Sequence, residues 1–166
     1  MTNNPKIKVQ INQIKGYEIL KKYESEKIKV FQNEVNIGPS ATKNKAMEFV
    51  TGDIISYIDH DDFWNPEYLT EVVKKFIGDV NVDVVYAGII KKNNTYLKGN
   101  KILDKVLQQG YLCSPSVLSV RKEFLVKNNL FWNESFLGSE DDIFCFELSR
   151  YANIECVEKP LVFYGA

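Results

Sequence analysis

Hydrophobic and polar positions in the first half of this chain alternate between strand-like and helix-like periods. Apolar side chains at every second position, or in short β-branched runs, predict strands over residues 6–11, 28–31, 54–58 and 82–90. Apolar side chains at helical spacing predict a helix over residues 16–24. Pro39 suits the first turn of a second helix, which Thr51 and Gly52 close, and Asn65 caps a third. Strands that alternate with helices in this way are typical of an α/β protein.

The second half of the chain has a less regular pattern. Residues 95–97 are predicted to return as a hairpin strand, and a short helix within residues 99–112 is predicted to end at Gly110. The elements predicted after it are a strand over residues 116–120, helices over 121–128 and 140–151, and a strand over 154–164 that Pro160 interrupts. Because strands alternate with helices through residue 90, we expect a mixed, mostly parallel sheet flanked by helices. Residues 1–166 are predicted to form a single domain.

Composition narrows the function classes. The chain has 166 residues, 45% of them hydrophobic, and a net charge of -1 from 21 basic and 22 acidic residues. This balance gives no electrostatic reason to expect a nucleic-acid partner. The sequence has no apolar run that would span a bilayer and no apolar core of a signal peptide near its start. Cys113, Cys145 and Cys156 are few, odd in number and not at metal-site spacing, so a cytoplasmic location is expected.

A group of acids follows the third predicted strand. Asp59, Asp61 and Asp62 come directly after its apolar residues, at the end of a strand where α/β proteins bind ligands. Period two places Asp59 and Asp61 on one face and His60 on the other. Two such carboxylates suit Mg²⁺ or Mn²⁺, completed by phosphate oxygens and water. The alternative is a solvated turn, with Asp62 supporting the start of the next helix.

A second acidic group lies at the start of the helix predicted over residues 140–151. Glu140, Asp141 and Asp142 follow Ser139 there. Acids complement the dipole at a helix N-terminus, and Ser139 with Asp142 resembles a capping box. The functional alternative is that one carboxylate is a general base, which takes a proton from an attacking hydroxyl group.

A third group is the glycine-led helix start at Gly38. Small residues at a helix N-terminus can cradle phosphate, and Lys43 would add positive charge. A single glycine before a helix is equally typical of a plain cap. His60 is the only histidine, which leaves little room for a Ser-His-Asp hydrolase site.

Two groups of segments carry a resemblance to a known family. The first consists of NIGPSATKN (residues 36–44), GD (52–53) and YIDHDDFWNP (57–66), and the second of PSVL (115–118), RKE (121–123) and GSEDD (138–142). In order and spacing they resemble the central and acceptor-side patterns of family 2 glycosyltransferases, which have the GT-A fold. The resemblance spans most of the chain.

The resemblance implies a Rossmann-like α/β fold and a role for each matching residue. It implies that Asp59 and Asp61 form an Asp-x-Asp element that contacts the nucleotide-sugar and its Mn²⁺ or Mg²⁺ ion. It further implies that Asp141 is the catalytic base of an inverting displacement and that Glu140 orients the acceptor. The donor-binding residues that it implies are Asp59, Asp61, Lys43, Asn36 and Gly38. The implied reaction transfers a sugar from a UDP-like donor to a hydroxyl group of a glycan or lipid-linked acceptor.

Two departures from the family pattern accompany the match. Lys43 stands where the family usually has arginine, which keeps the charge but loses the bidentate fork. Residues 6–15 are expected to be too short for a full βαβ unit, so the fold is expected to be shortened at its N-terminus. An incomplete sheet would leave an exposed edge, which favours a homo-oligomer. The alternative function that this suggests is a non-catalytic binding or assembly module. A metal-dependent phosphate or sugar hydrolase is a third hypothesis, since it needs the same acids.

Overall fold

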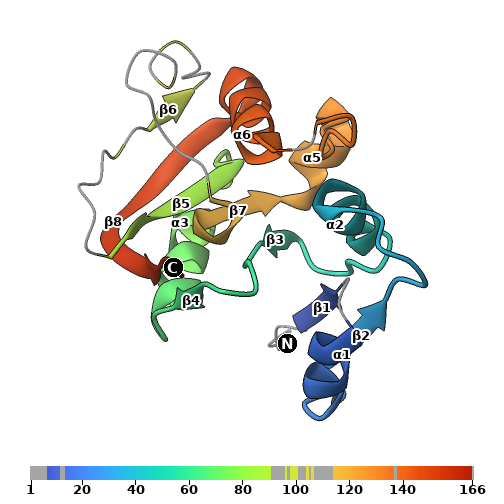
Figure 1. Cartoon of the computed structure of the whole chain (residues 1–166). Coiled ribbons are helices and arrows are strands. Elements are labelled where there is room, and N and C mark those ends of the chain that lie inside the picture. Colours follow the sequence, from blue (N-terminus) through green and yellow to red (C-terminus); the bar gives the residue numbers. More distant parts are fainter. Residues whose placement is uncertain are drawn as a thin grey trace. The chain divides into compact units, whose positions relative to one another are not determined.

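The computed structural model describes residues 7–11, 14–90, 96, 98–100, 104, 106, 114–136 and 138–165 (Figure 1). These residues group into two compact units. Unit 1 consists of Met1–Gly52 and Phe131–Glu140, and unit 2 of Asp53–Leu130 and Asp141–Ala166. That the two units form one GT-A-like domain stays a prediction.

Unit 1 begins with a βαβ arrangement. Strand β1 (Ile7–Ile11) pairs in parallel with β2 (Ile28–Gln32), and helix α1 (Ile14–Lys21) lies between them in the chain. Residues 6–15 were expected to be too short for a full βαβ unit, and this is wrong because the unit extends to β2. The connection from β1 to β2 supplies the dozen or so residues that a parallel crossover requires. The predicted strands and helix are otherwise confirmed, although α1 begins earlier than expected.

Helix α2 (Pro39–Met47) follows β2, with Pro39 at its first position as predicted. Gly38 precedes it with φ of 83°, a left-handed conformation that glycine adopts at little cost. The side chain of Thr42 donates to the Gly38 carbonyl oxygen and accepts from Asn33 Nδ2 over 3.1 Å. The helix ends at Met47 rather than near Gly52, because the hydrogen bonds of the following turns span three residues instead of four.

Unit 2 contains a six-stranded mixed sheet. Its strand order is β3-β7-β5-β8-β4, and β6 also pairs with β8. The strands are β3 (Ile54–Ser56), β4 (Phe63–Trp64), β5 (Val84–Ile89), β6 (Gly99–Asn100), β7 (Leu118–Arg121) and β8 (Asn153–Phe163). A short 3₁₀ turn, η1 (Pro115–Val117), leads into β7.

The sheet is mixed as predicted, but parallel pairing does not predominate in unit 2. Among the strands of unit 2 that the structure describes, only β5 and β8 are parallel. Strand β7 is antiparallel to both β3 and β5, and β4 and β6 are antiparallel to β8. A mostly parallel sheet was predicted because strands alternate with helices through residue 90, which includes β3 and β5. Strand β7 comes later in the chain and lies between them, so two parallel strands are separated by an antiparallel one.

Strand β8 continues through Pro160, which was expected to interrupt it. Ala87 is paired with Val157 and Gly88 with Pro160, so the register shifts between adjacent residues of β5. A bulge of this kind places proline where no ladder hydrogen bond is required from its nitrogen.

Helices cover both faces of this sheet. Ser119 of β7 contacts Tyr68 of helix α3 (Tyr68–Gly78), with 3.3 Å between the hydroxyl oxygens. Its neighbour Leu118 lies beside Cys145 and Leu148 of helix α6 (Glu140–Tyr151). Since successive side chains of a strand point to opposite faces, α3 and α6 lie on opposite sides of the sheet. Helix α5 (Lys122–Asn128) follows β7 directly.

The helices predicted over residues 121–128 and 140–151 are confirmed, and α6 has the predicted bounds. Tyr96 is the one described residue of the predicted hairpin return at 95–97, and no strand includes it. Of the helix predicted within 99–112, Asp104 and Val106 are helical, Gly99–Asn100 is a strand, and the other residues lie outside the described part of the chain. In the part that the structure describes, no helix is both long and apolar enough to cross a membrane.

Candidate functional site

The acids of unit 2 lie in a tight loop. Strand β3 ends at Ser56, and residues 59–62, called the acidic loop below, turn back so that the Asp62 N–H donates to the Asp59 carbonyl oxygen over 3.2 Å. The expected strand-like alternation of residues 59–61 is therefore wrong, because this backbone is a turn. His60 also does not face away from its acidic neighbours, since its Nδ1 lies 3.8 Å from Asp61 Oδ1.

Two buried serines hold the acidic loop from inside unit 2. Ser116 Oγ accepts from the Asp59 N–H over 2.8 Å, and Ser114 Oγ donates to Asp62 Oδ2 over 3.3 Å. Both serines are almost fully buried, and Asp62 is only 7% exposed. Trp64 Nε1 donates to the Ser116 carbonyl oxygen over 2.7 Å, which ties β4 to the same turn. Buried polar groups satisfied in this way define one conformation of the loop.

The acids of this loop differ in how far their side chains are exposed. Asp62 is taken up by structural hydrogen bonds to Ser114 and Gly165, and not by support of the start of the next helix, which the alternative interpretation expected. The Asp61 side chain is 52% exposed, and Asp59 is half-buried. Asp59 and Asp61 are thus the acids of the loop that can meet a ligand.

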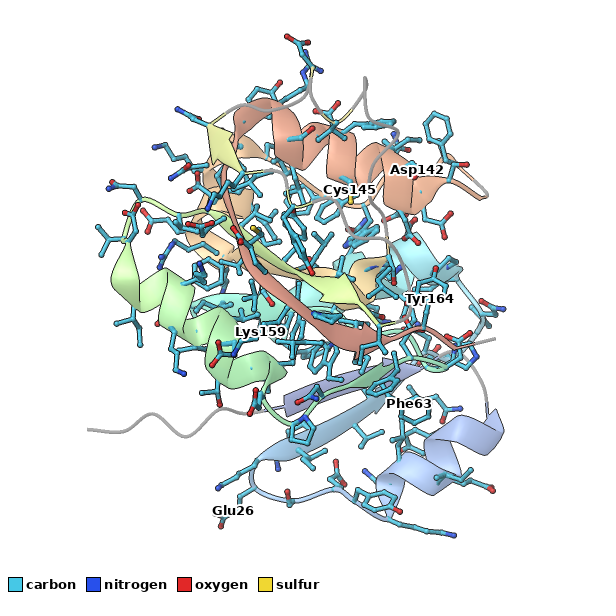
Figure 2. The ribbon with its side chains drawn as sticks, turned by 90° about the vertical axis from the view of Figure 1, so that its left-hand side faces the viewer. Glu26, Phe63, Asp142, Cys145, Lys159 and Tyr164 are labelled. Carbon is cyan, nitrogen blue, oxygen red and sulfur yellow. The ribbon has the colours of Figure 1, made fainter. Side chains whose placement is uncertain are left out.

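Tyr164 is influenced by acids of the acidic loop and of the start of α6. Burial raises the pKa of its phenol above the usual range, a hydrogen bond with Ser114 lowers it, and the negative charges of Asp62, Asp141 and Asp59 raise it further. Those three carboxylates are therefore near enough to act on one phenol electrostatically. In Figure 2, Tyr164, which directly follows β8, and Asp142 at the start of α6 lie on the same side of unit 2. The phenol thus responds to two acidic groups that are about eighty residues apart in the chain.

The start of α6 differs from the predicted capping box. Ser139 has φ of 68°, in the left-handed region, whereas a capping serine has extended backbone. Asp141 is half-buried and Asp142 is exposed. Glu140 is half-buried and belongs to unit 1 by its packing.

The other predicted donor-binding residues lie in unit 1. The Gly38 N–H donates to Asn36 Oδ1 over 3.0 Å, so the first amide of the expected phosphate cradle is already satisfied. Lys43 extends its ammonium over the ring of Trp132, with 4.2 Å from Nζ to the ring centroid. Asn36, Gly38 and Lys43 are therefore grouped around the N-terminal half of α2, as the sequence predicted, and Trp132 joins them.

The acids of the loop fit the predicted metal by number and type. Among the described residues, no three His, Cys, Asp or Glu side chains cluster as a complete metal site. Mg²⁺ is commonly held by one or two carboxylates together with substrate phosphates and water, and Asp59 and Asp61 supply two carboxylates. Their donor set therefore suits an ion that arrives with a diphosphate.

Sequence reasoning missed the residues that support this site. The acidic loop is hydrogen-bonded by Ser114, Ser116 and Gly165, and its acids act electrostatically on Tyr164. The sequence offered two signals for these supporting residues. One is the pair of serines on either side of Pro115, just before a strand, and the other is the glycine that follows the aromatic end of the last strand.

Comparisons with known proteins identify the family of this chain. The family model described as Glycosyl transferase family 2 matches residues 15–149. The uncharacterized glycosyltransferase MJ1057 of Methanocaldococcus jannaschii is 27% identical over 141 residues, which cover 78% of this chain and 48% of that protein.

Solved structures of S. aureus TarS share the fold. For TarS 1-349 the TM-score is 0.74 at 21% identity, covering 96% of this chain and 51% of the TarS chain. The structure of TarS 1-349 in complex with UDP-GlcNAc gives a TM-score of 0.76 at 21% identity, covering 96% of this chain and 49% of that one. The structure in complex with UDP gives 0.76 at 20% identity, with 96% and 50% covered. The chain thus spans about half the length of the relatives it matches.

Proposed function

Because the chain belongs to glycosyl transferase family 2, we propose that it transfers a sugar from a UDP-sugar to a hydroxyl group of a glycan or lipid-linked acceptor, with inversion. The observation that carries this proposal is that Ser116 holds the Asp59 backbone in a loop of unit 2, the unit to which the half-buried Asp141 also belongs. Asp59 and Asp141 both act electrostatically on the Tyr164 phenol. Carboxylates for the donor diphosphate and for the acceptor are then available within one unit. The complexes of S. aureus TarS with UDP and with UDP-GlcNAc support the choice of a UDP-sugar.

Asp141 is the general base of the proposed reaction. Its carboxylate accepts the proton of the acceptor hydroxyl as the oxygen forms a bond to the anomeric carbon, and the bond from that carbon to the diphosphate breaks on the opposite face. Glu140, the preceding residue, orients the acceptor. Positioned proton transfer of this kind contributes about 10²–10⁴-fold to a rate.

Asp59 and Asp61 hold the donor diphosphate through a cation in this proposal. Mn²⁺ or Mg²⁺, bound by these two residues, would supply positive charge that stabilises the leaving diphosphate. The family resemblance implies further donor contacts by Gly38, Asn36 and Lys43, which belong to unit 1. Since an ammonium group is a point charge, Lys43 would recognise phosphate without the paired geometry of arginine.

A titration of UDP in the presence and absence of Mn²⁺ tests the donor proposal. We expect Mn²⁺-dependent binding by the wild-type chain and its loss in Asp61→Asn, because that variant keeps the shape of the side chain but removes its charge. Asp142→Asn removes a neighbouring exposed charge and serves as the matched control, which should bind as the wild type does. If UDP with Mn²⁺ neither binds nor raises the melting temperature of the wild-type chain, the donor proposal is wrong.

A binding or assembly module is the second candidate function. In the order of the described strands, β3 and β4 are terminal, so each has an edge that no described strand pairs. Such edges favour association with another chain, including a second copy. This alternative was suggested by an N-terminal unit that was expected to be incomplete. The presence of β1, α1 and β2 weakens that reason. A monomer by light scattering that turns over UDP-sugar would exclude it, and release of free sugar alone would favour a hydrolase instead.

A cytoplasmic location belongs to the same proposal. Cys145 and Cys156 are buried and not joined in a disulfide. Free thiols of this kind suit a reducing compartment. Fractionation of cells that express the chain tests this point directly.

A further inference from the structure

The segment after β8 packs directly against the acidic loop. A Cβ atom on Gly165 would overlap the carbonyl oxygen of Asp61 and would lie 2.7 Å from its carbonyl carbon and 2.9 Å from its Cβ. Carbon atoms that are not bonded pack at about 3.5–4.0 Å, so no side chain fits here. The φ angle of Gly165 is not in the left-handed region. Glycine is therefore required at residue 165 for space and not for conformation.

Gly165 also bonds to the acidic loop. Its N–H donates to Asp62 Oδ1 over 2.8 Å, while Ser114 donates to the other oxygen of the same carboxylate. The Asp62 carboxylate is thus held from two sides, and a charged acceptor makes each of these bonds stronger than a neutral one. The backbone of the loop cannot shift at Asp61 or Asp62 without breaking the contact with Gly165.

The position of Gly165 is set by the sheet. Phe163 of β8 pairs with Phe63 of β4, which follows the acidic loop directly. Tyr164 directly follows the last residue of β8 and precedes Gly165. Gly165 comes two residues after Phe163, which is paired in the sheet, so its backbone has little freedom to move. It therefore limits how far the acidic loop can shift.

We propose that Gly165 is a positioning residue that holds the Asp61 backbone in the geometry needed to bind a metal-diphosphate group. This inference rests on the proposed function for its ligand, although its structural part concerns the ligand-free chain. Gly165 is not a ligand in this proposal. It acts through its close packing against Asp61 and its hydrogen bond to Asp62.

Gly165→Ala tests the inference, with Gly78→Ala as its matched control. Gly78 is the last residue of α3, has ordinary φ, and a Cβ there would meet no atom within 4 Å. In the ligand-free chain we expect Gly165→Ala to speed amide hydrogen exchange at Asp62 at least about tenfold and Gly78→Ala to leave it unchanged. With Mn²⁺ present, the affinity of Gly165→Ala for UDP should fall about ten- to a hundredfold. Binding of UDP without metal should not change.

The outcomes separate this inference from the function on which it rests. Unchanged exchange at Asp62 in Gly165→Ala overturns the inference, whatever the wild-type chain binds. Faster exchange in a wild-type chain that binds no UDP with Mn²⁺ instead contradicts the proposed function.

A second variant serves if Gly165→Ala does not fold. Asp62→Ala removes the acceptor of the Gly165 N–H and leaves Gly165 in place, so it should speed exchange at the Gly165 amide and lower Mn²⁺-dependent UDP affinity to a similar extent. Wild-type values for both in Asp62→Ala would overturn the inference.

Discussion

Asn44 binds the backbone of Trp132 at both of its polar groups. Its Oδ1 accepts from the Trp132 N–H over 2.9 Å, and its Nδ2 donates to the Trp132 carbonyl oxygen over 2.8 Å. The same Nδ2 donates to Glu134 Oε1 over 2.8 Å. One side chain of α2 therefore fixes a segment almost ninety residues away, within unit 1, and holds the Trp132 ring where Lys43 contacts it.

Replacement of Asn44 should loosen this segment. Asn44→Ala leaves a half-buried N–H and C=O of Trp132 without their protein partner, at a cost of about 1–3 kcal/mol for each group. We expect the free energy of unfolding, measured by urea denaturation, to fall by about 2–4 kcal/mol. Glu134→Gln is the control, because it keeps both Trp132 bonds and changes only an exposed one. An Asn44→Ala variant as stable as Glu134→Gln would contradict this account.

Glu71 ties α3 to β8 through Lys159, which lies on β8 (Figure 2). Hydrogen bonds from Lys74 and then Lys159 hold the pKa of the Glu71 carboxyl below its usual value. A carboxyl whose folded pKa is lowered stabilises the fold fully above its unfolded pKa, and this contribution is lost as the pH falls through the folded pKa.

Lys159→Met should therefore lower the melting temperature slightly near neutral pH and progressively less as the pH falls below the ordinary glutamate value. The measurement is a series of thermal melts from neutral to acidic pH, with the same substitution made in a Glu71→Gln background as control. In that background, Lys159→Met should lack this pH dependence. An effect of Lys159→Met that is equal at all pH values would exclude the ion pair as its cause.

Local patterns predicted the helices well and the site only in part. Helix α6 begins at Glu140 and ends at Tyr151 as predicted, because helical periodicity and an acidic first turn are properties of one segment. The acidic loop was predicted by residue type but given strand-like geometry, because its turn depends on Ser114, Ser116 and Gly165.

Those three residues are remote from the loop in sequence, and no period connects them to it. The position of β7 between β3 and β5 was missed for the same reason. Pairing between strands that are far apart in the chain depends on the whole fold and not on any local preference.

Asp141→Asn should separate catalysis from donor binding. The amide cannot accept the acceptor proton as a base does, so we expect kcat to fall by about 10²–10⁴-fold in a coupled assay of UDP release. The affinity for UDP with Mn²⁺ should stay within about twofold of the wild type, since Asp141 does not bind the diphosphate in the proposed mechanism. Asp142→Asn should retain both properties. A loss of UDP affinity in Asp141→Asn that equals the loss in kcat would assign this carboxylate to the donor instead.

Ser116 and Ser119 are buried serines with similar surroundings. Comparing alanine variants of the two distinguishes a residue that holds the site from one that stabilises the fold. Ser116 accepts from the Asp59 N–H, whereas Ser119 bonds to Ser56 over 2.7 Å and to Tyr68. Both are fully buried, so replacement by alanine should lower the free energy of unfolding by about 1–3 kcal/mol in either case.

The two variants should differ in ligand binding. Ser116→Ala releases the Asp59 backbone and should weaken Mn²⁺-dependent UDP binding about tenfold, while Ser119→Ala should bind as the wild type does. Urea denaturation gives the first quantity and calorimetric titration the second, on the same preparations. Equal losses of UDP affinity in both variants would mean that affinity follows global stability, and the contact between Ser116 and Asp59 would then have no separate role in holding the site.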